Sequence, residues 1–356
     1  MKILIRATNW IGDAIMSLPA LRAVRGQFPA AEITILAKPW VAALYEGERS
    51  VDRVMTFEGG SGAFDWAAKL ALISRLRKAR FDLAILFPNS FGSAAIVRFS
   101  GVKRVIGYAR DGRSFLLSDA IPVPREGELP RHQRFYYLEL LRRAGLIDAL
   151  PEVPEIRLDG AQDRRVRGEK LFDSLGVKRP VVGVSPGAAY GSAKRWLPER
   201  FAEAAWRLTV ETGGSVAVFG SAAEKTMCEE VARLAGGRSF AGATALSEFI
   251  DLTAACSLFL SNDSGAMHIA SALGVPSVTV FGPTDETATG PLGPAARTLR
   301  ESVECAPCLK RECPIDHRCM TRVTAENVVQ AAEKLLPLQP EHGRLLSCPD
   351  LKDRAR

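Results

Sequence analysis

The amino-acid sequence predicts an α/β protein of two domains, each built on a parallel sheet. Short apolar runs typical of buried strands alternate with amphipathic helical segments along the chain. The 356 residues exceed what one hydrophobic core usually serves. Polar loops follow several strand-like runs, and the ligands of open α/β sheets bind at that edge. These loops are therefore the candidate functional sites.

The first domain is expected at 1–160. It begins with a strand at 2–6 and a polar loop that ends at Asp13, directly ahead of a helix at 14–28 whose apolar residues lie three positions apart. The other expected elements are strands at 32–37, 53–57, 82–87 and 104–108, helices at 66–78 and 135–144, a flexible glycine-rich loop at 59–62 and a polar loop at 88–93.

The second domain is expected at 161–336, after a proline-containing linker, and a polar tail at 337–356 follows it. Pro198 suits the first turn of a helix. The expected elements are helices at 164–175, 199–211, 224–234, 246–255 and 325–336, strands at 180–185 and 215–219, and a loop at 186–196.

The stretch 257–285 has the pattern of a β-loop-α-β unit. An apolar run at 258–260 precedes a polar turn at 261–265, a helical segment that Gly274 and Pro276 end, and a strand at 277–281. The free N–H groups and the dipole at such a helix N-terminus favour an anion such as a phosphate. Asp263 is alternatively explained as a helix cap.

Composition excludes several protein classes. With 47% apolar and 24% charged residues, no membrane-length apolar stretch and no secretory leader pattern, a cytoplasmic protein is expected. The net charge of +7 suits anionic partners, but aromatic residues, at 7%, do not interleave with the basic ones, which disfavours nucleic acid. The chain has neither a GxGxxG fingerprint nor a Walker A motif, so no classical NAD or P-loop site is indicated.

Four loops together resemble a known enzyme family. They contain Asn9-Trp10-Ile11-Gly12-Asp13, Pro88-Asn89-Ser90-Phe91, Pro186-Gly187-Ala188 through Lys194-Arg195-Trp196, and Asn262-Asp263-Ser264-Gly265-Ala266-Met267-His268. In this order and spacing, the chain up to about residue 336 resembles the ADP-heptose:lipopolysaccharide heptosyltransferases. Agreement of several separate loops is far more specific than one short motif.

The resemblance implies a GT-B fold, in which two Rossmann-like domains with parallel sheets face each other across a cleft. The N-terminal domain would bind the acceptor and the C-terminal domain ADP-heptose. It also implies an inverting transfer of L-glycero-D-manno-heptose to the first heptose of the lipopolysaccharide inner core. The chemistry would require no cofactor. Because that acceptor is lipid-anchored, peripheral contact with the cytoplasmic face of the inner membrane is expected.

The resemblance assigns the catalytic roles to two side chains. An inverting transfer needs a base for the acceptor hydroxyl and positive groups for the departing diphosphate. Asp13 matches the base of the family, although a carboxylate at a helix start is more often an N-cap. Lys194 matches the lysine that contacts phosphate, although a solvated loop lysine is the more common case. The neighbouring Arg195 either shares this phosphate contact or pairs with an acidic side chain elsewhere.

The remaining candidates would bind the two substrates. Ser264 and Gly265 suit the diphosphate, and the Asp263 carboxylate, which repels phosphate, suits sugar hydroxyls or loop fixation. His268 is either a donor contact or a structural histidine. Ala188, Ala189, Ser221, Glu224 and Thr244 would line the nucleotide pocket, and Asn89 and Ser90, with Arg110 and Arg113, would meet the phosphorylated acceptor. Exposed arginines without a ligand are the alternative.

Cys305, Cys308, Cys313 and Cys319 form a C-x2-C-x4-C-x5-C cluster. Such a cluster is compatible with a structural zinc ion, with His317 as a substitute ligand, but the spacing departs from the standard two-knuckle pattern. Two disulfides and free thiols are the other states. No metal is expected among the active-site residues.

Two other functions stay open at this point. A nucleotide-sugar epimerase, or a transferase of another sugar, would use the same scaffold, because fold does not determine function. A basic nucleic-acid-binding protein with a zinc ribbon at 305–319 belongs to a different class, and strongly salt-dependent oligonucleotide binding would identify it.

Overall fold

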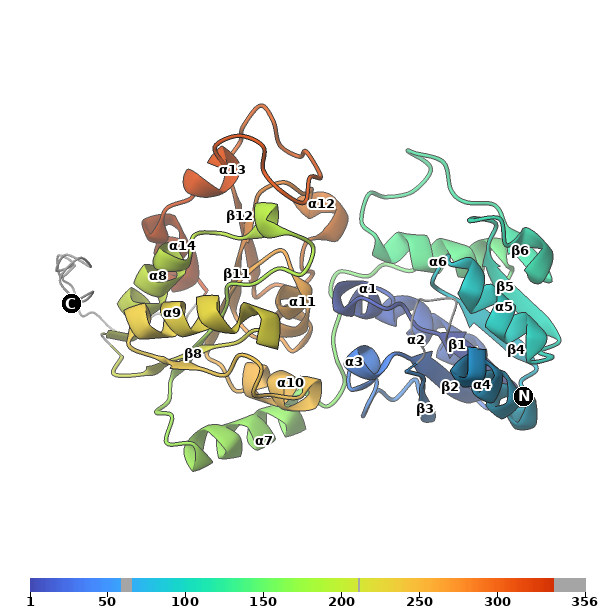
Figure 1. The fold of residues 1–356 in the computed structure, drawn as a ribbon. Coiled ribbons are helices and arrows are strands. Elements are labelled where there is room, and N and C mark those ends of the chain that lie inside the picture. The colour runs from blue at the N-terminus through green and yellow to red at the C-terminus, as the bar shows by residue number, and fades with distance from the viewer. Residues whose placement is uncertain (59–65, 211, 336–356) are drawn as a thin grey trace. The chain divides into compact units, whose positions relative to one another are not determined.

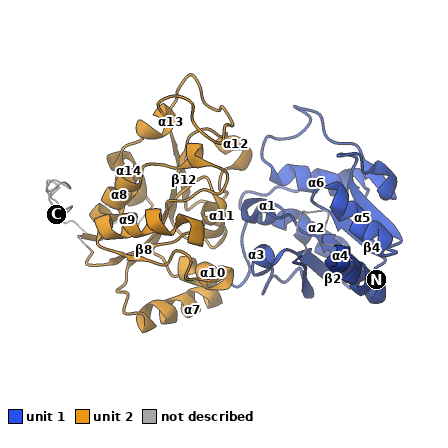
Figure 2. Ribbon diagram, viewed as in Figure 1, with its two compact units in different colours: residues 1–160 blue, residues 161–356 orange. Residues whose placement is uncertain are grey.

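The computed structural model describes residues 1–58, 66–210 and 212–335. The chain divides into two compact units, Met1–Gly160 (unit 1) and Ala161–Arg356 (unit 2), which Figure 2 shows in separate colours. The expected glycine-rich loop at 59–62 and the expected tail at 337–356 lie outside the described residues. None of the described helices is long and apolar enough to cross a membrane.

Unit 1 is a six-stranded parallel sheet in the order β3-β2-β1-β4-β5-β6 (Figure 1). The central strands are almost entirely apolar because helices cover both faces of the sheet. The strands are β1 (Lys2–Arg6), β2 (Glu32–Ala37), β3 (Arg53–Thr56), β4 (Leu83–Leu86), β5 (Arg104–Tyr108) and β6 (Asp119–Ile121).

The helices of unit 1 lie in two layers. α4 (Trp66–Ala79), α5 (Phe91–Phe99) and the 3-10 turn η1 (Ser114–Leu116) pack on one face of the sheet through a shared apolar cluster. The others are α1 (Ile11–Met16), α2 (Leu18–Gln27), α3 (Pro39–Ala42) and α6 (Arg134–Arg143), of which α2 and α6 pack against each other. The outer surface of α4, α5 and η1 is therefore one continuous layer.

The expected single helix at 14–28 is wrong. The structure has two helices, α1 and α2, which meet at Ser17. Pro19 has no N–H group with which to continue the hydrogen-bond ladder of α1, and Ser17 Oγ donates to the carbonyl of Ala14 at 2.8 Å. Because α1 begins at Ile11, Asp13 lies within its first turn, and the N-cap residue is Trp10.

Unit 2 repeats the arrangement with the strand order β12-β11-β10-β7-β8-β9. The two parallel six-stranded sheets confirm the α/β fold class. The strands are β7 (Val181–Ser185), β8 (Ser215–Val218), β9 (Arg238–Ser239), β10 (Leu258–Asn262), β11 (Ser277–Phe281) and β12 (Ala296–Arg300).

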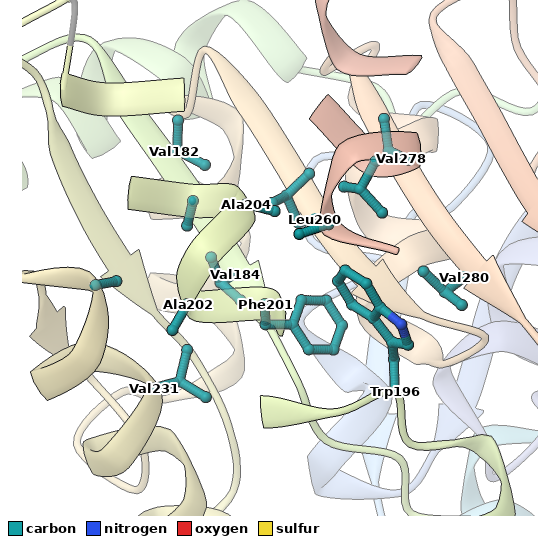
Figure 3. Close-up of a cluster of buried hydrophobic side chains, with 14 of the residues drawn as sticks. Val182, Val184, Trp196, Phe201, Ala202, Ala204, Val231, Leu260, Val278 and Val280 are labelled. Atoms are coloured by element: carbon teal, nitrogen blue, oxygen red, sulfur yellow. The ribbon is translucent and has the colours of Figure 1, made fainter. Parts of the chain in front are cut away.

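Two apolar clusters hold the helices of unit 2 to its sheet. α8, α9 and α14 cover one face. On this face the Trp196 and Phe201 rings pack edge to face, with their centroids 4.8 Å apart (Figure 3). α7 and α10 cover the other face together with α11. The helices are α7 (Ala161–Ser174), α8 (Pro198–Val210), α9 (Lys225–Ala235), α10 (Leu246–Ala254), α11 (Gly265–Ala272), α12 (Glu286–Thr289), α13 (Arg318–Thr321) and α14 (Ala325–Glu333), with 3-10 turns η2 (Ser192–Lys194) and η3 (Ala222–Glu224).

Several short elements have no counterpart in the sequence prediction. The edge strands β6, β9 and β12 contain few apolar residues, so they lack the pattern of a buried strand. α5 begins at Phe91, inside the polar loop expected at 88–93. These elements form because the neighbouring strand or helix supplies their hydrogen-bond and packing partners.

Candidate active site

Each sheet has one topological switch point, and the predicted residues gather there. In unit 1, β1 and β4 are neighbours, and the chain runs outward from them in opposite directions. In unit 2, β7 and β10 stand in the same relation. The segments that follow these four strands carry Asp13, in the first turn of α1, and Asn89, Lys194 and Asp263. Ligands of open α/β sheets bind at such points, so each unit has its own candidate site.

The carboxylate of Asp13 is held by a tyrosine of α6. Tyr137 Oη donates to Asp13 Oδ1 at 3.0 Å. Burial of the phenol and the nearby negative charge of Asp13 raise the pKa of Tyr137 well above its ordinary value, so the phenol stays neutral and donates. The sequence pattern did not identify Tyr137, because it lies on a helix 124 positions away.

Tyr137→Phe should lower the turnover number about ten-fold, because a hydrogen bond to a charged group contributes on the order of 1.5–3 kcal/mol. The apolar packing of the ring is retained, including its edge contact with Phe87 at 5.4 Å. Steady-state kinetics should therefore show a lower kcat at unchanged KM. An unchanged kcat would show that the hydrogen bond does not matter for the reaction.

The chain ahead of Asp13 is fixed from two sides. Arg6 Nη2 donates to Asn9 Oδ1 at 2.7 Å, and Trp40 Nε1 donates to the Asn9 carbonyl at 2.9 Å. Burial lowers the pKa of Arg6 to about 10, which still leaves the guanidinium charged at neutral pH. The loop between β1 and α1 is thus held in one conformation.

The loop after β4 is built around a buried arginine. Arg113 is fully buried and donates to the carbonyls of Pro88 at 2.5 Å and Tyr108 at 3.1 Å. Asn89 Nδ2 donates to Tyr136 Oη at 2.9 Å, and Ser90 is exposed. The expectation that Arg113 meets the acceptor is therefore wrong: its cation supports the loop from inside, whereas Arg110 is exposed.

Arg113→Met should lower the free energy of unfolding of unit 1 by about 2–4 kcal/mol, because buried carbonyl oxygens lose their donor. Urea unfolding followed by tryptophan fluorescence measures the change. Arg110→Met, at an exposed position nearby, is the matched control and should change stability by less than about 0.5 kcal/mol. Equal effects of the two substitutions would contradict the supporting role of Arg113.

In unit 2, Lys194 and Asp263 form an ion pair. Lys194 Nζ lies 2.5 Å from Asp263 Oδ2, and Thr284 Oγ1 donates to the same oxygen at 2.6 Å. The Lys194 side chain is 13% exposed, so it is not a solvated loop lysine. Asp263 precedes the N-cap residue of α11 and binds these two side chains, which corrects its interpretation as a helix cap.

The N-terminus of α11 has no side-chain cap. The N-cap residue is Ser264, and its side chain makes no capping hydrogen bond. Within the described part of the chain, the buried Ser264 Oγ has no hydrogen-bond partner. Gly265 begins the helix, and His268 is buried one turn further along. An unpaired hydroxyl at a helix N-terminus suits a phosphate oxygen.

Asn262 clamps the loop that carries Lys194. Its side chain is fully buried; Oδ1 accepts from the Trp196 N–H at 2.9 Å and Nδ2 donates to the Pro186 carbonyl at 2.7 Å. Both ends of the loop 186–196 are therefore tied to β10. The sequence pattern did not identify this role, because the two partners of Asn262 lie 66 and 76 positions away.

The cysteine-containing loop packs against the same segment. Tyr190 Oη donates to the Leu309 carbonyl at 2.9 Å, and the Ala193 N–H donates to the Arg311 carbonyl at 2.9 Å. His317 Nε2 lies 2.8 Å from the Ala193 carbonyl. The loop 305–317 thus supports the backbone that precedes Lys194.

The four clustered cysteines are unpaired, two of them exposed, one half-buried and one, Cys319, buried. The pKa of Cys319 is raised, mainly because its thiol is buried. Among residues 1–58, 66–210 and 212–335, no group of three or more His, Cys, Asp or Glu side chains is arranged to hold a metal ion. The structural zinc site stays a prediction.

The other nucleotide-pocket candidates lie in the segments that follow β7, β8 and β9. Ala188 is buried, Ala189 is exposed and Thr244 is half-buried ahead of α10. Glu224 accepts from the Ser221 N–H at 2.9 Å and from Ser221 Oγ at 2.8 Å, which forms a capping box at η3. Glu224 therefore stabilises the start of η3.

Two Rossmann-like units in one chain, each with a polar site at its switch point, are the architecture of the GT-B class of glycosyltransferases. The chain belongs to glycosyltransferase family 9, the heptosyltransferase family, whose model matches residues 69–318. This membership confirms the resemblance found in the sequence and makes the protein a glycosyltransferase.

Named relatives agree with the family. The chain is 33% identical to lipopolysaccharide heptosyltransferase 2 of Escherichia coli strain K12 over 310 residues, which cover 84% of this chain and 88% of that protein. It is 34% identical to the Salmonella typhimurium protein of the same name over the same shares of both chains. The structure of E. coli ADP-heptose lps heptosyltransferase II superimposes with a TM-score of 0.78 at 29% identity, covering 94% of this chain and 98% of that one.

Proposed function

We propose that this chain transfers L-glycero-D-manno-heptose from ADP-heptose to the first heptose of the lipopolysaccharide inner core, with inversion at the anomeric carbon. The observation that carries the proposal is the pairing of Lys194 with Asp263 beside the N-terminus of α11, which has no side-chain cap. A cation and free N–H groups at one switch point suit a sugar diphosphate. The relatives named above are heptosyltransferases, and one is named for ADP-heptose, which supports heptose as the transferred sugar.

The reaction is one displacement. An acceptor hydroxyl oxygen forms the new bond to the anomeric carbon, and the bond from that carbon to the ADP oxygen breaks with its electron pair. Asp13, as general base, takes the hydroxyl proton, and ADP leaves as the anion. Unit 1 would hold the acceptor near Asp13, Asn89 and Ser90, and unit 2 would hold ADP-heptose.

The donor site would hold charge in two ways. An ammonium group has three N–H donors, so Lys194 can keep its bond to Asp263 and still meet the diphosphate. Ser264 and Gly265 would donate to the phosphates, while Asp263 and His268 would face the sugar. Ala188, Ala189, Glu224 and Thr244 would surround the nucleotide. Stabilising the leaving diphosphate is the largest contribution that such a site makes to the rate.

The acceptor in this proposal is anchored in lipid, so the enzyme would work in peripheral contact with the cytoplasmic face of the inner membrane. We expect no nucleic-acid partner, because the aromatic residues of the chain do not interleave with the basic ones. No cofactor would take part in the displacement.

The test is acceptor-dependent release of ADP. The purified chain is incubated with ADP-heptose and heptosyl inner-core acceptor, and ADP and the extended saccharide are quantified together. Equal amounts of both products are expected, with the new linkage of inverted configuration by NMR. Consumption of ADP-heptose at the same rate without acceptor would instead support an epimerase or a hydrolase.

A further inference from the structure

In the part of the chain that the structure describes, exposed aromatic side chains are confined to unit 1. Among the described residues, the exposed tryptophan and phenylalanine side chains all belong to this unit; they are Trp10, Trp40, Trp66, Phe91, Phe99 and Phe115. Large aromatic side chains cost free energy when water covers them, and they normally lie in cores or interfaces. Their concentration in one unit indicates that part of its surface meets a partner.

Three of these rings lie on the outer layer of α5 and η1. Phe91, Phe99 and Phe115 are 47%, 60% and 74% exposed. Phe91 and Phe99 are eight residues apart on α5 with the half-buried Ala95 between them, so they share one face of the helix. The Phe115 ring of η1 lies 6.0 Å from that of Phe91. Leu70 of the adjoining α4 is 61% exposed and adds to the apolar layer.

The same layer is strongly basic. The segment 66–101, which contains α4 and α5, has one acidic residue, Asp82, and six basic residues: Lys69, Arg75, Arg77, Lys78, Arg80 and Arg98. The carboxylate of Asp82 already accepts a hydrogen bond from the Lys2 N–H at 2.9 Å, and its Oδ1 lies 3.9 Å from Lys103 Nζ. Arg77 Nη2 donates to the Phe99 carbonyl at 2.7 Å, which places a cation at the end of the apolar face. An anionic partner would therefore complement this surface.

We propose that the outer surface of α4, α5 and η1 docks on a bilayer that contains anionic phospholipids. Aromatic rings partition into the headgroup region, and lysines and arginines beside them are attracted to anionic headgroups. This combination of exposed rings and unbalanced positive charge is typical of helices that lie on membranes. None of the described helices spans a bilayer, so the contact would be peripheral.

The position of the surface fits the proposed function, on which this part of the inference rests. α5 begins directly after Asn89 and Ser90, and Arg113, which precedes η1, donates to the Pro88 carbonyl. The rings that would enter the headgroup region are thus next to the loop proposed to meet a lipid-anchored acceptor.

The experiment measures sedimentation of the full chain with vesicles, without substrates. The unmodified protein should bind vesicles of phosphatidylethanolamine and phosphatidylglycerol, should not bind phosphatidylcholine alone, and should dissociate with added salt. Phe99→Ser/Phe115→Ser should lower the partition coefficient about ten-fold or more. Arg98→Gln should lower it about five-fold.

The matched control is Val166→Ser/Leu175→Ser, which removes two exposed apolar side chains from unit 2 and should leave binding unchanged. Circular dichroism and unaltered turnover of a delipidated, soluble acceptor verify that the variants are folded. Failure of the unmodified chain to bind anionic vesicles, equal binding to phosphatidylcholine, or unchanged binding of the phenylalanine variant would overturn the proposal. The proposal would also be overturned if the unmodified chain formed a dimer that only the phenylalanine substitutions dissociate. Because the assay contains no substrate, none of these outcomes bears on heptosyl transfer itself.

Discussion

Asp13→Asn should reduce the rate of heptosyl transfer by about 10²–10⁴-fold, which is the range that a positioned general base contributes. Asparagine has nearly the same shape as aspartate, and its side-chain oxygen still accepts from Tyr137, so the first turn of α1 should keep its conformation. What would be lost is the ability, proposed above for Asp13, to take the acceptor proton.

Single-turnover kinetics with saturating acceptor measure this loss, and calorimetry measures binding of ADP-heptose, which should not change. Asp148→Asn, at an exposed position of unit 1, is the matched control and should have the rate of the unmodified enzyme. An Asp13→Asn enzyme with full activity would remove Asp13 from the mechanism and require another base.

Lys194→Met should reduce kcat/KM by about 10²–10³-fold, because the proposed contact of its cation with the leaving diphosphate would be lost. The substitution has a second consequence. Asp263 is buried, and its carboxylate accepts from the side chains of Lys194 and Thr284. Without Lys194, it keeps only the hydroxyl of Thr284 of these two donors. A buried carboxylate without its cation destabilises the loops around it, and this effect alone lowers activity.

The double variant Lys194→Met/Asp263→Asn separates the two effects. If Lys194 only neutralises Asp263, the neutral pair should recover most of the activity. If Lys194 contacts the diphosphate, the double variant should fold normally and remain at least as inactive as the single one. Affinity for ADP, measured by calorimetry, should fall in both variants. Lys225→Met, at an exposed lysine of unit 2, serves as the control.

Local patterns in the sequence predicted most of the regular elements. The apolar runs of β1, β7 and β10 are buried strands because helices cover both faces of the sheets. The patterns failed where stability comes from a neighbour, as in the edge strand β12, and where one proline interrupted an otherwise periodic helix at 14–28. Periodicity reports which face of a segment is apolar, but not which partner it has.

The candidate site divides in a similar way. The polar loops could be found from the sequence because glycine, serine, asparagine and aspartate after an apolar run are typical of strand-to-helix turns. Their residue order also identified the family, which the family match at 69–318 confirms. The Tyr137 hydrogen bond, the Asn262 clamp and the buried position of Arg113 could not be found in this way, because each joins segments that are distant in the chain.

The sequence by itself therefore determined the alternation of strands and helices, the loops rich in polar residues and the membership of a family. Only the tertiary structure decided which loops become neighbours: the loops after β1 and β4 meet at one switch point, and those after β7 and β10 at the other. The physical reason is that local hydrophobic pattern determines an element, whereas the order of strands depends on the packing of the whole sheet. Lys194 and Asp263, 69 positions apart in the sequence, form their ion pair through that order.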